Sequence, residues 1–268
     1  MKNFLWALKF LTIIPIDKKD SIKPERGSKV VFWFPVVGLC IGILLAIVYL
    51  FFYSFFPVIV ADALIILFYI AITGALHLDG LADACDGIWG GWNKEKRLEI
   101  MKDSRIGCYG AIGLICSMGI RYLSLYCSSE GHVLNNSLFV NYLKCGTCFV
   151  TPVLLTKCTA LILMPVAGRW AQVCAAGLSV YARNEQGTGS FVFEGTKSRH
   201  IIYASIIPIG LFWYFLNIGG VINFIIILIF TLFWIWYVKR KIGGMTGDTL
   251  GATNELAELI FLLSLLFR

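Results

Sequence analysis

Long runs of apolar residues, separated by short polar segments, dominate the chain. A helix that spans the hydrocarbon core of a bilayer needs about 20 apolar residues. The runs cover roughly 30–54, 58–78, 107–127, 138–165, 200–217, 220–238 and 249–267. They predict an all-α transmembrane helical bundle of six to seven spans, with 1–268 as a single domain. Only the second half of the last run is continuously apolar, so whether that run fully spans is left open.

The first 16 residues follow a different pattern. They are apolar, but Lys2 and Lys9 are seven positions apart and therefore share one helical face. No small-residue cleavage site follows, and 17–29 are polar and basic. The segment is therefore expected to be an interfacial amphipathic helix rather than a signal peptide.

The composition supports a membrane protein, since 58% of the 268 residues are hydrophobic. A formal charge of +7 would suit nucleic acid, but the basic residues gather at the ends of the apolar runs. Anionic lipid and membrane topology explain that placement better, so no nucleic-acid partner is expected. The nine cysteines mostly lie inside apolar runs, and Cys145-x-x-Cys148 has no second pair to form a zinc site. They are predicted to be small packing residues.

The basic residues also predict an orientation. Segments 1–29, 79–106, 166–199 and 239–248 carry seven, five, four and three Lys or Arg, whereas 128–137 and 217–220 carry none. Cytoplasmic loops are enriched in Lys and Arg. We therefore expect a multi-pass protein of the cytoplasmic (inner) membrane, with the N-terminus and the four basic segments facing the cytoplasm.

Acidic residues form a stripe within one of these basic segments. Asp79, Asp83 and Asp86 occur at i, i+4 and i+7, so on a helix they lie within roughly 60° of one another. Three carboxylates on one stripe repel each other, and a divalent cation such as Mg²⁺, which takes oxygen ligands, would remove that repulsion. Asp103 follows after a short connection. These four aspartates are our predicted metal ligands, against the alternative of solvated carboxylates at a helix end.

The sequence of this segment resembles that of a known protein family. HLDGLADACDG at 77–87 and LEIMKDSRIG at 98–107 are similar to the cobalamin synthases, the adenosylcobinamide-GDP ribazoletransferases. The resemblance continues in FLTIIP, FWFPVVGLCIG, VYARNEQGTG and GGMTGDTLGATNELAELIFLL, and so covers nearly the whole chain. It implies an Mg²⁺-dependent transfer of adenosylcobinamide phosphate from adenosylcobinamide-GDP to α-ribazole or α-ribazole 5′-phosphate. This step of cobalamin nucleotide-loop assembly releases GMP.

The implied reaction is a displacement at a pyrophosphate. It requires charge neutralisation on the pyrophosphate and an aligned alcohol, which two Mg²⁺ ions held by the aspartates could supply. One carboxylate could accept the hydroxyl proton, and the sequence does not choose which. His77 lies roughly opposite the acidic stripe. It is interpreted as a buried, hydrogen-bonded histidine or, alternatively, as a base or a support for a metal ligand.

Several further charged residues are candidates for substrate contacts. Lys102, Arg105, Arg169 and Arg183 are expected either to bind phosphate or to anchor at the interface. Arg183 stands out because Gly187 and Gly189 follow it, and a glycine-rich loop lets backbone N–H groups approach phosphate. Asp248 and Glu255 share a helical face and could reach the metals or bind the nucleobase or ribose. Asp248 could instead cap the last helix.

Charged residues inside the apolar runs are expected to contact water, the interface or a cavity. Asp62 is expected to be hydrated near the outer end of its span, while Arg121 and Lys144 are expected to extend toward the interface. Lys157 is placed near the inner third of its span, where it could line the active cavity.

Two other function classes share some of these features. A CDP-alcohol phosphotransferase also carries a multi-aspartate motif, but with an Ala-Arg after the Asp-Gly and a different aspartate spacing. A transporter also places carboxylates in a membrane, but near its midplane and usually with inverted repeats. Neither pattern is present here. Besides the two substrates, membrane lipid and a possible homo-oligomer are the expected partners.

Overall fold

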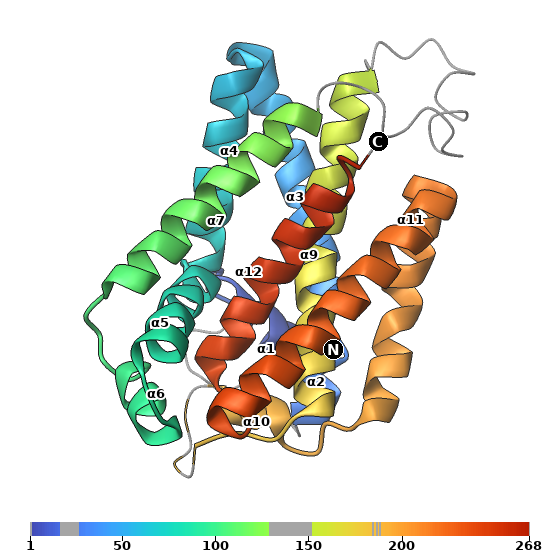
Figure 1. The fold of residues 1–268 in the computed structure, drawn as a ribbon. Coiled ribbons are helices and arrows are strands. Elements are labelled where there is room, and N and C mark those ends of the chain that lie inside the picture. The colour runs from blue at the N-terminus through green and yellow to red at the C-terminus, as the bar shows by residue number, and fades with distance from the viewer. Residues whose placement is uncertain are drawn as a thin grey trace.

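The computed structural model describes residues 2–16, 27–128, 152–183, 185, 187 and 189–267, and Figure 1 shows their fold. Apart from an isolated bridge between Tyr181 and Met245, the regular structure of these residues is helical. The prediction of an all-α membrane bundle is confirmed. The helices are α1 (Lys2–Leu11), α2 (Gly27–Val31), α3 (Phe34–Phe55), α4 (Val58–Thr73), α5 (Leu76–Gly90), α6 (Lys94–Ile100), α7 (Cys108–Cys127), α9 (Pro152–Leu178), α10 (Ser190–Phe193), α11 (Ser198–Ile242) and α12 (Gly247–Ser264).

The number of spans depends on how two helices are counted. Within the described residues, four helices are long and apolar enough to cross a membrane, or five if the bent pair α4–α5 counts as one span. Helix α11 reverses direction at Asn217, whose φ of 52° and ψ of −132° are not helical. Its two limbs correspond to the runs at 200–217 and 220–238 (Figure 1). Counting the two limbs separately gives the predicted six spans, and adding the half-polar α12 gives seven.

The second predicted run is not one straight helix. Helix α4 ends at Thr73, and α5 leaves it at an angle of 88°. Gly74 and Ala75 at the break both have left-handed backbones, with φ of 61° and 57°. The expectation of a continuous helix to residue 78 is therefore wrong. The bend lets α5 pack against α7 and α12.

Helix α9 is the centre of the bundle. It contacts α3, α11 and α12, and most of its side chains between residues 160 and 176 are buried. We expected this span to end near residue 165 and residues 166–182 to form a cytoplasmic loop, but α9 continues to Leu178. The start of the expected run, with Lys144, Cys145 and Cys148, lies outside the described residues.

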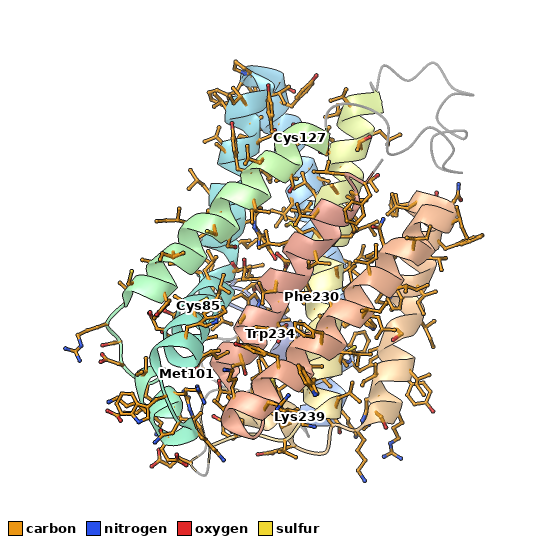
Figure 2. The ribbon with its side chains drawn as sticks, viewed as in Figure 1. Cys85, Met101, Cys127, Phe230, Trp234 and Lys239 are labelled. Carbon is orange, nitrogen blue, oxygen red and sulfur yellow. The ribbon has the colours of Figure 1, made fainter. Side chains whose placement is uncertain are left out.

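The polar connections gather at one end of the bundle. Met245 N–H donates to Val180 at 2.9 Å, and Ser28 N–H donates to Glu194 at 3.2 Å. Figure 1 shows α2, α6, α10 and the α11–α12 connection together at the lower end. Side chains fill the space between α11 and α12, where Trp234 Nε1 donates to Thr253 Oγ1 at 3.1 Å (Figure 2). The grouping expected from charge is thus present, while its orientation in a cell stays a prediction.

Candidate active site

Helices α5 and α12 touch backbone to backbone. A Cβ atom added to Gly80 would lie 2.8 Å from the carbonyl oxygen of Asp248 and 3.2 Å from the Cα of Gly251. Such contacts are closer than real Cβ atoms make, so only glycine allows this approach. The contact brings Asp79 and Asp83 of α5 beside Asp248, in the first turn of α12.

Asp83 lies within the field of several neighbouring charges. Asp248, Asp79 and Asp86 act on it as like charges, and Arg183 acts as an opposite charge. Arg183 Nη2 donates to Asp248 Oδ2 at 2.7 Å, and their side chains are 14% and 21% exposed. Burial raises the pKa of Asp248, and Arg183 opposes that rise. The guanidinium of Arg183 therefore acts on the carboxylates of both Asp83 and Asp248.

Asp248 does not cap its helix. The cap of α12 is Thr246, whose side chain accepts a hydrogen bond from the backbone N–H of Thr249. The capping alternative for Asp248 is therefore wrong, and its carboxylate instead accepts from Arg183 and from the Thr246 hydroxyl.

Three hollows share some of these charged residues in their linings. A cavity of about 170 Å³ lies among α1, α3, α5, α9 and α12, and Asp79, Arg183 and Asp248 line it. A hollow of about 320 Å³ between α4, α5 and α7 shares Asp79 with it and adds Asp83. A hollow of about 430 Å³ beside α6 shares Arg183 and adds Lys94 and Lys102. Parts of separate substrates can therefore meet at one acidic and basic centre.

The four predicted metal ligands are not brought together as a set. Asp86 accepts from the backbone N–H groups of Gly107 and Gly110, at 2.7 and 2.8 Å, and so holds the start of α7. Asp103 accepts from Arg105 at 2.6 Å in an exposed turn, and these hydrogen bonds lower the pKa of Asp103 to about 2.

The carboxylates of Asp79, Asp83 and Asp248 meet only part of what a metal site requires. No three His, Cys, Asp or Glu side chains of the described residues stand close enough to hold a metal ion as they are. The chemistry of the donors does fit a hard cation, because Asp79, Asp83 and Asp248 offer carboxylate oxygens at one place. Asp79, Asp83 and Asp248 are therefore the candidate carboxylates that remain once Asp86 and Asp103 are engaged by other partners.

Two predicted substrate ligands lie in a buried cluster instead. Arg169 is fully buried and donates to Tyr69 and Glu258. Arg121 is also buried and pairs with Glu255 and with Glu258, the latter at 2.7 Å. This corrects three expectations: Arg169 as a phosphate ligand, Glu255 as a metal or nucleotide ligand, and Arg121 as an interfacial side chain. Each charge is neutralised by a partner, which allows it to stay inside the bundle.

A second buried ion pair corrects two further expectations. Lys157 donates to Asp62, and each side chain is 1% exposed. Asp62 is therefore not hydrated, and Lys157 does not line the cavities described above. The pair joins α4 to α9.

The other predicted residues lie at the open end of the site. Lys102 bonds Glu185 at 2.6 Å, and both side chains are at least half exposed. Arg105 is 87% exposed beside Asp103. Both cations remain available to a substrate phosphate, since surface ion pairs are weak.

His77 is buried, as one of its two interpretations expected. Its ring Nδ1 lies 3.4 Å from Gln172 Nε2, and both residues line the 170 Å³ cavity. Gln172 was missed from sequence. The available signal was a polar side chain three residues after Arg169, inside an apolar run.

Comparisons with known proteins show the family of the chain. The chain matches the family described as cobalamin-5-phosphate synthase over residues 3–266. It is 38% identical over 266 residues to an adenosylcobinamide-GDP ribazoletransferase of Clostridium novyi (strain NT), with 99% of this chain and 97% of that protein covered. A Clostridium botulinum (strain Okra) protein with the same description is 37% identical, with 99% and 98% covered. A Thermoanaerobacter sp. (strain X514) relative of that description is 31% identical, with 98% and 96% covered. No solved structure matches.

Proposed function

The chain belongs to the cobalamin-5-phosphate synthase family, and we propose that it is an integral-membrane adenosylcobinamide-GDP ribazoletransferase. It would join adenosylcobinamide phosphate to α-ribazole or α-ribazole 5′-phosphate and release GMP. One observation carries the assignment to this site. Asp79, Asp83, Asp248 and Arg183 line three hollows, of which the first shares Asp79 with the second and Arg183 with the third.

The chemistry is a displacement at phosphorus. The ribazole 3′-hydroxyl attacks the phosphorus nearer the cobinamide, the bond from that phosphorus to the bridging oxygen breaks, and GMP leaves with that oxygen. Arg183 is placed to bind the pyrophosphate, because a guanidinium fits two phosphate oxygens at once. Asp79 and Asp83 both line the hollow between α4, α5 and α7 and are the candidates to accept the hydroxyl proton.

Magnesium is part of this proposal. We propose that Asp79, Asp83 and Asp248 hold it, where bound Mg²⁺ would neutralise charge on the pyrophosphate. Asp86 and Asp103 act as positioning residues, because they hold the start of α7 and the turn before it. We further propose that this end of the bundle faces the cytoplasm across the inner membrane, on the basis of its basic residues.

Turnover of the purified protein tests the proposal. With Mg²⁺, adenosylcobinamide-GDP and α-ribazole, wild type should release GMP, and chelation should stop the release. Asp79→Asn and Asp83→Asn should each lower kcat at least about a hundredfold, because Asn keeps the shape and removes the charge. Glu194→Gln is the control, because Glu194 is exposed and lines none of the three hollows. Near-normal turnover of both aspartate variants at low Mg²⁺ would remove these residues from the site.

A further inference from the structure

Two buried polar side chains line the 170 Å³ cavity besides the charged residues described above. His77 of α5 and Gln172 of α9 are each only 3% exposed. His77 Nε2 and Gln172 Oε1 have no hydrogen-bond partner among the described residues. Burying polar atoms without partners is costly, so such a pair lining a cavity points to a ligand.

The contacts of Gln172 indicate which atoms of the Gln172–His77 pair donate hydrogen bonds and which accept them. Its Nε2 lies 3.3 Å from the carbonyl oxygen of Leu250, which can only accept. The second hydrogen on Nε2 is then directed to His77 Nδ1, at 3.4 Å, which must accept it. A neutral imidazole that accepts at Nδ1 carries its proton on Nε2. The pair therefore offers one open donor, His77 Nε2–H, and one open acceptor, Gln172 Oε1.

The rest of the cavity indicates the shape of the ligand. Phe10, Phe34, Leu76 and Tyr181 form apolar and aromatic walls. Sites that hold a whole drug-sized ligand have volumes of about 300–1,000 Å³. At about 170 Å³, this cavity suits one ring system rather than a complete corrinoid. Arg183 lines the same cavity, so a phosphate on the same ligand would have a cation to bind there.

We propose that His77 and Gln172 form a subsite for a carbonyl oxygen that stands beside an N–H group, as on the lactam edge of guanine. His77 Nε2–H would donate to the carbonyl oxygen, and Gln172 Oε1 would accept from the N–H. The proposal rests on the proposed function, in which a guanosine nucleotide leaves. Adenine presents these two groups in the reverse order, with the donor on the exocyclic nitrogen and the acceptor in the ring, so it mismatches the pair when its phosphate is held at Arg183. A corrinoid carboxamide presents the same carbonyl and N–H chemistry and is the second possible source.

Equilibrium binding to the purified full-length protein in detergent with Mg²⁺ tests the subsite. GMP and IMP should bind within threefold of each other, because both carry the lactam edge. AMP and 1-methyl-GMP should bind at least tenfold more weakly, which corresponds to about 1.4 kcal/mol. Gln172→Met should weaken GMP at least tenfold and change AMP less than threefold. Thr231→Val is the control, because its hydroxyl is also buried without a partner among the described residues, but on α11.

The outcomes distinguish guanine from a corrinoid carboxamide as the ligand of the subsite. Equal binding of GMP and 1-methyl-GMP, with cobinamide phosphate weakened at least tenfold by Gln172→Met, would support the subsite with a corrinoid carboxamide as its ligand. If neither ligand responds, the proposal is overturned and trapped water satisfies the pair. The wild-type nucleotide series decides the guanine question even if Gln172→Met fails to fold. Wild-type GMP release tests the proposed function separately: turnover with a flat nucleotide series and an unresponsive variant would overturn the subsite alone.

Discussion

At the scale of single residues, two arginines show what sequence can and cannot separate. Arg169 and Arg183 were predicted alike, as phosphate ligands or anchors. The structure buries Arg169 against Glu258, which is 89 residues away in the chain, and leaves Arg183 in the cavity beside Asp248. A partner so distant in sequence leaves no local pattern. The glycines after Arg183 were the local difference used, and they favoured the arginine that lines the cavity.

Replacing Arg183 by Lys tests its proposed contact with the pyrophosphate. Lysine keeps the charge but loses the planar fork that binds two oxygens. Hydrogen bonds to charged groups contribute roughly 1.5–3 kcal/mol, which corresponds to a tenfold to hundredfold change in affinity. We expect Arg183→Lys to lower kcat/KM for adenosylcobinamide-GDP at least about tenfold, with little change in the dependence on α-ribazole. Steady-state kinetics with each substrate varied in turn measures both effects.

Arg199→Lys is the matched control, because Arg199 is an exposed arginine at the same end of the bundle. It should behave as wild type. If Arg183→Lys is also silent, or if only the ribazole dependence changes, Arg183 does not hold the pyrophosphate.

At the scale of helices, the spacing of Asp79, Asp83 and Asp86 predicted that they share one helix. It did not predict which neighbouring helix each of them faces. Asp79, Asp83 and Asp86 do lie on α5. Asp86 turns to the start of α7, whereas the other two lie near Asp248 of α12. That division follows from the contacts of α5 with both α7 and α12, which the 88° bend before α5 allows. No proline marks the bend, and an apolar run that passes through a single glycine reads as one helix, so the bend was missed.

The close contact of α5 with α12 gives a prediction at this scale. Gly80→Ala places a Cβ where Asp248 backbone atoms lie, so the two helices must separate. We expect turnover to fall at least about tenfold, since small displacements of positioned groups are costly. Thermal unfolding in detergent should shift downward. Gly119→Ala is the control, because nothing lies within 4 Å of its added Cβ. Alanine also favours a helix over glycine by roughly 0.5–1 kcal/mol, so that variant should be at least as stable as wild type. Equal turnover of both variants would contradict the role of the contact.

At the scale of the whole molecule, composition predicted the class of fold, and charge predicted which connections share an end (Figure 1). The buried ion pairs were not predictable in the same way. Asp62 and Lys157 were judged separately, as a hydrated and a cavity-lining residue, although they neutralise each other. Reasoning about one span at a time assigns each charge to water or headgroups. Only the pairing of Asp62 on α4 with Lys157 on α9 shows that neither charge needs water or a headgroup.

The orientation of the bundle is tested by labelling single cysteines in a variant that lacks the nine native ones. Asn93 and Arg199 lie at the basic end, before α6 and in the first turn of α11, and both are exposed. Phe56 joins α3 to α4 at the other end and is 44% exposed. Cysteines at Asn93 and Arg199 should react with an impermeant maleimide only from the cytoplasmic side, and a cysteine at Phe56 only from outside.

Retained GMP release would show that each variant is folded. The reverse pattern would overturn the orientation, because the positive-inside bias would then have failed. Labelling of Asn93 and Phe56 from one side would instead mean that α3 and α4 do not cross the membrane as a pair.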